Sequence, residues 1–208
     1  MSFTITLIII TVALSVYAQN TPGIKSQWMM NPYQAYHRKQ YYRFITSGFI
    51  HDDWMHLGFN MFTLMFFGQV IETTYMMYFG IQTGQFLFLV LYIGGIVVSD
   101  IPNFLRYKDA PAYNTLGASG GVSSVIFACI LFNPLANICL YALICLPGFI
   151  LGTFYIIYSA TLARGSHDNV NHNAHLYGAL FGLAFSIAIL PQVVPHFFQQ
   201  LANWKGFF

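Results

Sequence analysis

Charged side chains are scarce in this chain. Of its 208 residues, 8 are Lys or Arg and 6 are Asp or Glu, so that 7% are charged, against roughly 25% in soluble domains. Hydrophobic residues make up 57% of the chain. The scarcity of charge excludes an ordinary water-soluble enzyme, and the composition favours a protein that lies in a lipid bilayer.

Basic runs and a cysteine framework are also missing. The net charge is +2 without a basic cluster, which gives no reason to expect nucleic acid as a partner. The three cysteines, Cys129, Cys139 and Cys145, lie in apolar stretches. We therefore expect them to be small buried hydrophobic side chains and not disulfide partners or metal ligands. No motif indicates a cofactor.

Apolar segments of about 20 residues are long enough to cross about 30 Å of hydrocarbon as helices. The sequence predicts six such spans, at residues 3–18, 54–75, 84–99, 117–132, 135–159 and 173–190. Asn133-Pro134 separates the fourth from the fifth, because proline disfavours helix in the residue before it. We expect a single all-α polytopic membrane domain over residues 1–208.

The first span and the connection after it need separate comment. A signal peptide is the alternative for the first span, since residues 16–18 imitate a cleavage site, but the basic leading segment is missing and a retained helix is favoured. The connection over residues 19–53 is rich in Tyr and Trp, which prefer the membrane interface. We expect this loop to lie partly in the interface.

A serine among glycines opens the fourth span, in the run Gly117-Ala118-Ser119-Gly120-Gly121. The run matches the nucleophile elbow of soluble hydrolases literally, but that motif needs a strand before it, and here a polar loop precedes it. A helix that begins at this run would instead offer unpaired backbone N–H groups to an oxyanion. The alternative is close helix packing through the glycines.

A histidine opens the sixth span. His175 stands at the head of a stripe of small residues, Gly178, Gly182 and Ser186, along which a neighbouring helix backbone can approach closely. A serine on that neighbour could then meet the imidazole as its base. The alternative is a histidine at the membrane surface. Glu72 is the only glutamate, and no acid offers itself as a third member, so a Ser-His dyad is predicted.

His56 and Asn60 share one face at the start of the second span, because they are four residues apart. Their side chains offer two donors that could supplement backbone N–H groups around an oxyanion. Metal binding is the rival interpretation, given seven histidines in the chain. Zinc hydrolases of the H-E-x-x-H type, however, pair their histidines with a nearby glutamate, which is missing here.

Taken together, these ordered motifs resemble those of the rhomboid family of intramembrane serine proteases, of the type with a six-helix core. The similarity runs over residues 42–190, nearly three quarters of the chain. The motifs that carry it are Tyr42-Arg43, His56-x-x-x-Asn60, Phe67-Gly68 with Glu72, Gly117-Ala118-Ser119-Gly120, and Ala174-His175 followed by Gly178 and Gly182.

The resemblance implies a serine endopeptidase that cuts the transmembrane segments of single-pass membrane proteins, without a metal or other cofactor. It implies that Ser119 is the nucleophile and His175 the general base. It further implies an oxyanion hole made of His56, Asn60 and the Ser119 amide. The residues expected to support the site are Gly117, Gly120, Gly178, Gly182 and, in the first loop, Arg43.

Two positions depart from the family pattern. Tyr42 precedes Arg43 where family members usually carry Trp, a change that keeps an aromatic beside the cation. Many bacterial members place a tyrosine four residues after the serine, where its ring packs on the catalytic histidine, and this chain has Ser123 there. Another aromatic, or simple helix packing, must therefore orient His175.

The same resemblance implies how a substrate reaches the site. A transmembrane helix would enter sideways between the second and fifth spans and unwind locally, with Pro147-Gly148 providing a kink in the fifth span. The polar segment 161–172 suits a lid over a cavity that admits water.

The distribution of positive charge conflicts with the family orientation. With alternating spans, one side carries Lys25, Arg38, Lys39, Arg43, Arg106, Lys108 and Arg164, and the other carries Lys205. The positive-inside rule would place the serine on the cytoplasmic side. The family places the serine on the extracytoplasmic side of the membrane, which for a bacterial protein is the inner membrane. We follow the family.

Two other classes of protein fit the sequence less well. A catalytically inactive relative that binds transmembrane clients would keep the fold and lose the dyad, whereas both residues of the dyad are present. A transporter or channel would be expected to show paired intramembrane charges or repeat symmetry, and neither is visible in the sequence.

Overall fold

The computed structural model describes residues 2–140, 144–163 and 171–206. In chain order its elements are α1 (Phe3–Asn20), α2 (Ile24–Trp28), α3 (Pro32–His37), α4 (Arg43–Thr46), the 3-10 turn η1 (Ser47–Phe49), α5 (Trp54–Thr63), the π-helical turn η2 (Leu64–Gly68), α6 (Gln69–Phe79), α7 (Ile81–Tyr107), α8 (Ser119–Phe132), β1 (Asn137–Leu140), β2 (Ile144–Pro147), α9 (Gly148–Leu162), α10 (His172–Ile189) and α11 (Val193–Ala202).

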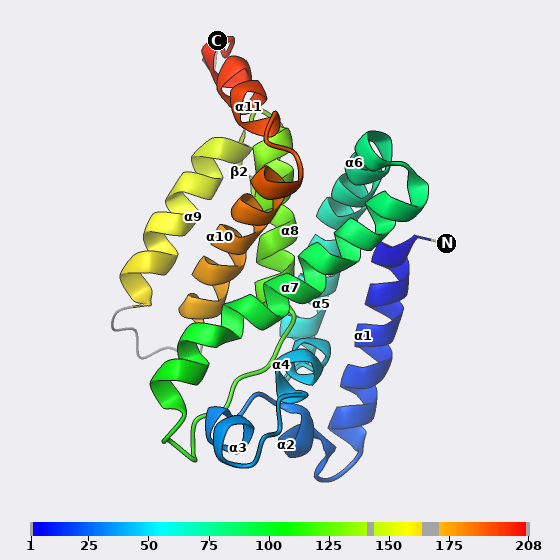
Figure 1. Cartoon of the computed structure of the whole chain (residues 1–208), viewed down its shortest axis with the longest axis vertical. Coiled ribbons are helices and arrows are strands. Elements are labelled where there is room, and N and C mark those ends of the chain that lie inside the picture. Colours follow the sequence, from blue (N-terminus) through cyan, green and yellow to red (C-terminus); the bar gives the residue numbers. More distant parts are fainter. Residues whose placement is uncertain (1, 141–143, 164–170, 207–208) are drawn as a thin grey trace.

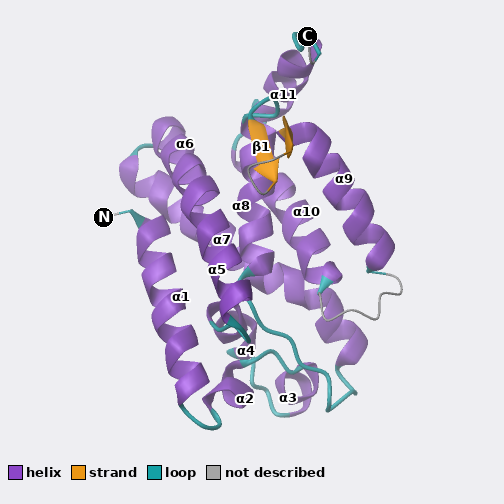
Figure 2. Cartoon of the chain, turned by 180° about the vertical axis from the view of Figure 1, so that it is seen from behind, coloured by secondary structure: helices purple, strands orange, loops and turns teal. Residues whose placement is uncertain are grey.

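The bundle is built around α8. This helix runs through the middle of the molecule, with α7 and α10 packed against it and with α1 and α9 on opposite outer sides (Figures 1 and 2). Twelve of its fourteen residues are buried. A helix that is buried on every side must be apolar on every side, which explains why α8 shows no polar face in its sequence.

The first connection is folded and lies at the end of the bundle where α8 begins (Figure 1). It contains α2, α3, α4 and η1. Backbone hydrogen bonds join Met30 to Thr115, in the segment that leads into α8. The first loop therefore supports the segment that precedes Ser119.

The first helix is anchored through a carboxylate on α6. Glu72 accepts hydrogen bonds from the Ser2 hydroxyl at 2.6 Å, the Phe3 N–H at 2.7 Å and the Thr4 N–H at 2.9 Å. These N–H groups have no partner within their own helix, and a negative charge at a helix N-terminus is stabilising. The first span is therefore part of the packed fold.

The segment before α9 corrects the predicted fifth span. The prediction placed a helix over 135–159, but β1 and β2 form an antiparallel pair and α9 begins only at Gly148. Short apolar runs fit strands and buried helices equally well, which is why periodicity missed the hairpin. Pro147 ends β2, so Pro147-Gly148 marks the start of a helix and not a kink within one.

The hairpin also corrects the expectation for two cysteines. Cys139 and Cys145 lie directly opposite each other in the β1–β2 register and form a disulfide. Pairing of the strands brings the two side chains together, and that pairing could not be seen in the apolar pattern. Cys129 is free and buried, as expected.

By length and composition, two of the described helices, α1 and α7, are suited to cross a membrane. A third candidate arises if α10 and α11, which are bent by 110° at the break between them, form one span. The apolar helices α8 and α9 are shorter. The structure is thus a mostly helical membrane fold, and the number of six spans stays a prediction.

Candidate functional site

Ser119 is the first residue of α8, and the backbone before it has a shape that requires glycine. Gly117 has a φ of +118°, which side-chain-bearing residues rarely adopt. A Cβ at this position would also lie 2.6 Å from Cε1 of the His56 ring. The glycine thus sets the turn into α8 and lets His56 approach the backbone beside Ser119.

Two further hydrogen bonds fix this turn. The Gly117 N–H donates to the Ser47 carbonyl at 2.9 Å, and the Ala118 N–H donates to Nε2 of His51 at 3.2 Å. Nδ1 of His51 then carries the proton and lies 3.1 Å from the Ser15 hydroxyl. Burial lowers the pKa of His51 to about 3, so this histidine is neutral.

Arg43 lies inside the first loop. It is buried and donates to the Ser26 carbonyl at 2.9 Å and to the Met29 carbonyl at 2.7 Å, while its Nε donates to the Gln40 side chain at 2.8 Å. Burial lowers the pKa of Arg43 from its usual value. Through its hydrogen bonds, the guanidinium holds together the parts of the loop that support the turn into α8.

His175 lies on the first turn of α10, whose start is fixed by amide side chains. Asn171 caps the helix by accepting from the Ala174 N–H at 3.1 Å. The same oxygen accepts from Asn103 of α7 at 2.8 Å, and Asn103 in turn accepts from Asn173 at 2.9 Å. This network sets the position of the turn that carries His175.

The predicted glycines bring α8 and α10 into backbone contact. A Cβ at Gly178 would collide with the Gly120 carbonyl oxygen, and one at Gly182 would collide with the Ser124 carbonyl oxygen. On the other side of α8, a Cβ at Gly120 would collide with the Ser99 side chain of α7. The nucleophile candidate and the base candidate therefore stand on two helices that touch through their main chains.

His56 and Asn60 stand on successive turns of α5, and the His56 ring lies against Gly117 in the turn into α8. Asp53 caps α5 by accepting from the His56 N–H at 2.7 Å. The buried Asn60 amide donates one hydrogen bond to the His56 carbonyl at 2.9 Å, which leaves a second N–H available.

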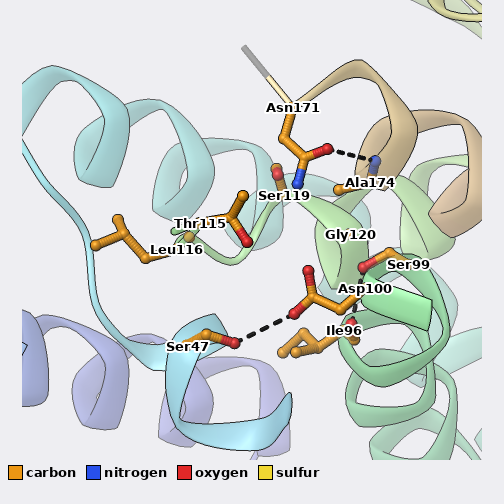
Figure 3. A pocket seen from close by; sticks show the side chains of 11 residues that line it. Ser47, Ile96, Ser99, Asp100, Thr115, Leu116, Ser119, Gly120, Asn171 and Ala174 are labelled. Atoms are coloured by element: carbon orange, nitrogen blue, oxygen red, sulfur yellow. Dashed lines mark hydrogen bonds between the residues drawn. The ribbon is translucent and has the colours of Figure 1, made fainter. Parts of the chain in front are cut away.

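A small cavity of about 10 Å³ lies beside Ser119, with room for about one water molecule. Its polar lining includes Ser47, Ser99, Asp100, Thr115 and Asn171 (Figure 3). Ala174, the neighbour of His175, lines the same cavity as Ser119. In this conformation of the described residues no hydrogen bond joins Ser119 to His175, and such contacts often form only when a substrate is bound.

Sequence reasoning missed two side chains that support this site. Asp100 is buried on α7, lines the cavity and accepts a hydrogen bond from the Ser47 hydroxyl at 3.3 Å, whereas from the sequence no acid had offered itself as a member of the site. Tyr155 of α9 stacks on His175, with ring centroids 6.1 Å apart and planes 21° apart. The one local signal for Asp100 is its position directly after the third predicted span, 84–99. Nothing in the sequence distinguishes Tyr155 from the other aromatic residues.

Two further expectations concern metal binding and the lid. Among the described ranges, no three His, Cys, Asp or Glu side chains gather as a metal ion would require. Residues 164–170 of the predicted lid over 161–172 lie outside the described residues.

Comparison with known proteins places these observations in a family. The model of the rhomboid domain matches residues 38–192. RHOMBOID-like protein 12, mitochondrial, of Arabidopsis thaliana is 28% identical over 74% of this chain and 49% of its own length. Rhomboid-like protein 11, chloroplastic, of the same plant is 28% identical over 87% of this chain and 62% of its own length. Rhomboid protease AarA of Providencia stuartii is 26% identical over 94% of this chain and 74% of its own length.

The chain spans about half to three fifths of the length of the two plant relatives. The rhomboid-domain match nevertheless covers well over half of this chain and includes Arg43, the α5 histidine, Ser119 and His175. The resemblance that the motifs predicted is thereby confirmed, and proteins of this family are integral to membranes. This protein belongs to the rhomboid family.

Proposed function

We propose that this protein is an intramembrane serine protease that cleaves transmembrane segments of membrane-protein substrates. The observation that carries the proposal is the contact of α8 with α10 through Gly120 and Gly178, which holds the helix starts that bear Ser119 and His175 side by side. A hydroxyl at a helix start and an imidazole next to it form the pair that acyl transfer needs.

In the proposed reaction, Oγ of Ser119 attacks the scissile carbonyl carbon while His175 takes the hydroxyl proton. The oxygen that becomes negative is stabilised by the Ser119 N–H, His56 and the second N–H of Asn60. Collapse of this intermediate breaks the C–N bond, and His175 gives its proton to the leaving amine. Water then attacks the acyl carbon while His175 takes a proton from it, and the polar cavity beside Ser119 offers that water a place. The bond between Oγ of Ser119 and the acyl carbon breaks, the carboxylic acid leaves, and His175 returns the proton to Oγ.

The substrate must reach this site from within the bilayer. A transmembrane helix hides its carbonyls in hydrogen bonds, so it must unwind locally before attack. The outer position of α9 suits lateral entry between α5 and α9, as the resemblance implied. Small residues are expected at the cut, because bulky ones would crowd the glycine-rich turn before α8.

The orientation in the membrane is proposed from the family alone, with the site open to the extracytoplasmic side. The first loop and the α7–α8 connection, with their cations, do lie at one end, so the conflict with the positive-inside rule stands. A cysteine at Ala112, after removal of the native cysteines, should react with an impermeant thiol reagent in intact cells, whereas one at Ala202 should not. The reverse pattern would overturn this orientation. The expected location in a bacterial inner membrane is not supported by the comparisons, because two of the relatives are named as mitochondrial and chloroplastic proteins.

The deciding experiment uses purified protein in detergent with a fluorogenic transmembrane substrate. Ser119→Ala and His175→Ala should each abolish cleavage while thermal unfolding stays near that of the wild type, because both remove reacting groups and not core packing. A fluorophosphonate should label the wild type and not Ser119→Ala. Retained cleavage in either variant would overturn the dyad, and an inactive, unlabelled wild type would favour a binder of transmembrane clients. Loss of activity in EDTA, reversed by zinc, would favour a metal site.

A further inference from the structure

We propose that Tyr155 is a positioning residue for His175 and that Ser123 holds the Tyr155 ring in place. The inference rests on the proposed function, in which His175 is the general base. Its observation is a stack of two rings from neighbouring helices, Tyr155 on α9 and His175 on α10, with centroids 6.1 Å apart and planes 21° apart. This separation lies within the range of favourable offset stacking.

His175 needs such a partner because the described residues offer its ring little else. In many serine proteases a carboxylate accepts a hydrogen bond from the second imidazole nitrogen and so fixes the ring. Across the described part of this chain, no hydrogen bond reaches either ring nitrogen of His175. Its ring contacts are Tyr155 and, edge to face with centroids 6.2 Å apart, His172. Packing against rings therefore sets the orientation of the imidazole.

Tyr155 is itself held by α8, the helix that carries Ser119. Its hydroxyl oxygen lies 2.9 Å from the Ser123 hydroxyl oxygen, and either group can donate. Its ring also packs against Phe127, with centroids 5.5 Å apart. Ser123 follows Ser119 by one helical turn and is buried. The nucleophile helix thus fixes the aromatic that fixes the base.

The other aromatics of α9 show that Tyr155 is not simply part of an aromatic helix surface. Its neighbours Phe154 and Tyr158 are 63% and 59% exposed, whereas Tyr155 turns into the bundle. The departure at Ser123 is thereby explained: a tyrosine from α9 occupies the place beside the histidine, and a small residue at position 123 leaves room for it and bonds to it. The base also becomes sensitive to the position of α9.

The test compares four single variants by two readouts, kcat and KM on the transmembrane substrate and the rate of fluorophosphonate labelling at Ser119. Tyr155→Leu removes the ring and should lower kcat and the labelling rate about 10-fold with KM nearly unchanged. Tyr155→Phe and Ser123→Ala each remove only the hydroxyl contact and should lower both rates about 3-fold. Phe154→Leu, the matched control on the exposed side of α9, should leave both rates unchanged.

An exchange variant separates positioning from packing. Ser123→Tyr combined with Tyr155→Ser places the aromatic on α8 and the small hydroxyl on α9, and it should recover most of the labelling rate lost in Tyr155→Leu. Wild-type kcat and labelling in Tyr155→Leu would overturn the inference and leave the proposed function intact. A fall in Tyr155→Leu that is confined to KM would also overturn it. If Tyr155→Leu does not fold, unchanged rates in Tyr155→Phe and Ser123→Ala would do the same. A wild type that neither cleaves nor labels would overturn both proposals.

Discussion

The helices α8 and α9 are both short and apolar, yet they are built in opposite ways. Twelve of the fourteen residues of α8 are buried, and glycines bring its main chain against those of α7 and α10. Of the fifteen residues of α9, only Gly148, Gly152 and Ser159 are buried. The candidate nucleophile stands on the first helix, whereas the second reaches the site through Tyr155.

The difference shows how one bundle can combine a fixed reaction geometry with access for a large substrate. Main-chain contacts cannot adjust by rotating a side chain, so α8 and α10 must keep their separation. Contacts made by side chains on an outer helix can open and close at small cost. We therefore expect substitutions in the α5–α8–α10 part to affect the chemical step strongly, and substitutions on the outer face of α9 to affect it little.

The largest expected effect on kcat distinguishes two matched polar side chains, one in the α5–α8–α10 part and one on the outer face of α9. Asn60 on α5 and Thr153 on α9 each donate to the carbonyl four residues earlier, at 2.9 Å and 2.7 Å, but Asn60 is buried one turn after His56 and Thr153 is exposed. Asn60→Ala should lower kcat by about 100- to 1000-fold, the loss seen when one oxyanion donor is removed. Thr153→Ala should leave kcat unchanged.

Steady-state kinetics on the transmembrane substrate measures both variants, and KM should change less than kcat for Asn60→Ala. If Asn60→Ala kept wild-type turnover, its hydrogen bond to the His56 carbonyl would be structural only. If Thr153→Ala slowed turnover as much, the contrast between the two helices would fail.

The next effect concerns matched glycines in helix interiors. A Cβ at Gly178 would collide with the Gly120 carbonyl oxygen, which belongs to the main chain, whereas a Cβ at Gly152 would lie 3.0 Å from the end of the Ile130 side chain. Gly178→Ala should destabilise the protein by about 3 kcal/mol, at the upper end of overpacking. Gly152→Ala should change stability by less than about 1 kcal/mol, because Ile130 can move and alanine favours helix.

Thermal unfolding in detergent measures both glycine variants. Gly58→Ala on α5 serves as a further control, since a Cβ there meets nothing within 4 Å. Equal losses at Gly178 and Gly152 would show that α9 is packed as rigidly as α10.

The same contrast explains how much of the fold the sequence could reveal. The helices at 3–20, 119–132 and 172–189 are marked by long apolar runs and breaks, and their predicted bounds lie within a few residues of those observed. The hairpin before α9 was missed because four-residue strands of apolar residues carry no period that separates them from helix. The disulfide followed from that pairing and was missed with it.

The site divides in the same manner. Ser119, His175, His56 and Asn60 stand in local motifs, so their positions could be predicted, and their catalytic roles stay predictions. The residues that orient them do so across large distances in sequence: His51 bonds to Ala118, Asn103 to Asn171, and Tyr155 stacks on His175. Such partners are set by how the helices pack, and a single sequence carries no local signal for them.

The smallest expected effect concerns the segments that lead into α8 and α9, which are held in place in different ways. The hairpin before α9 is closed by a disulfide, whereas the turn before α8 is held by neutral His51, which accepts from the Ala118 N–H. Burial lowers the pKa of His51 to about 3, against 6.5 for the exposed side chain in the unfolded chain. Between these two values the unfolded state binds a proton that the folded state does not. The contribution of His51 to the free energy of unfolding should therefore fall as the pH drops below 6.5, by about 2 kcal/mol between pH 7 and pH 5, and become constant below pH 3.

Replacing the histidine isolates this contribution from that of the carboxylates. His51→Gln removes the titrating group and keeps a side chain that can accept from the Ala118 N–H. The free energy of unfolding of the wild type, minus that of the variant, should therefore fall by about 2 kcal/mol from pH 7 to pH 5. Thermal unfolding in detergent across this range measures it. A pH-independent difference would mean that His51 becomes protonated within the fold, and that the turn before Ser119 is held without it. Reduction of the Cys139–Cys145 disulfide should leave the fluorophosphonate labelling rate unchanged, because the hairpin lies near the end of α8 (Figure 2), whereas Ser119 is the first residue of that helix.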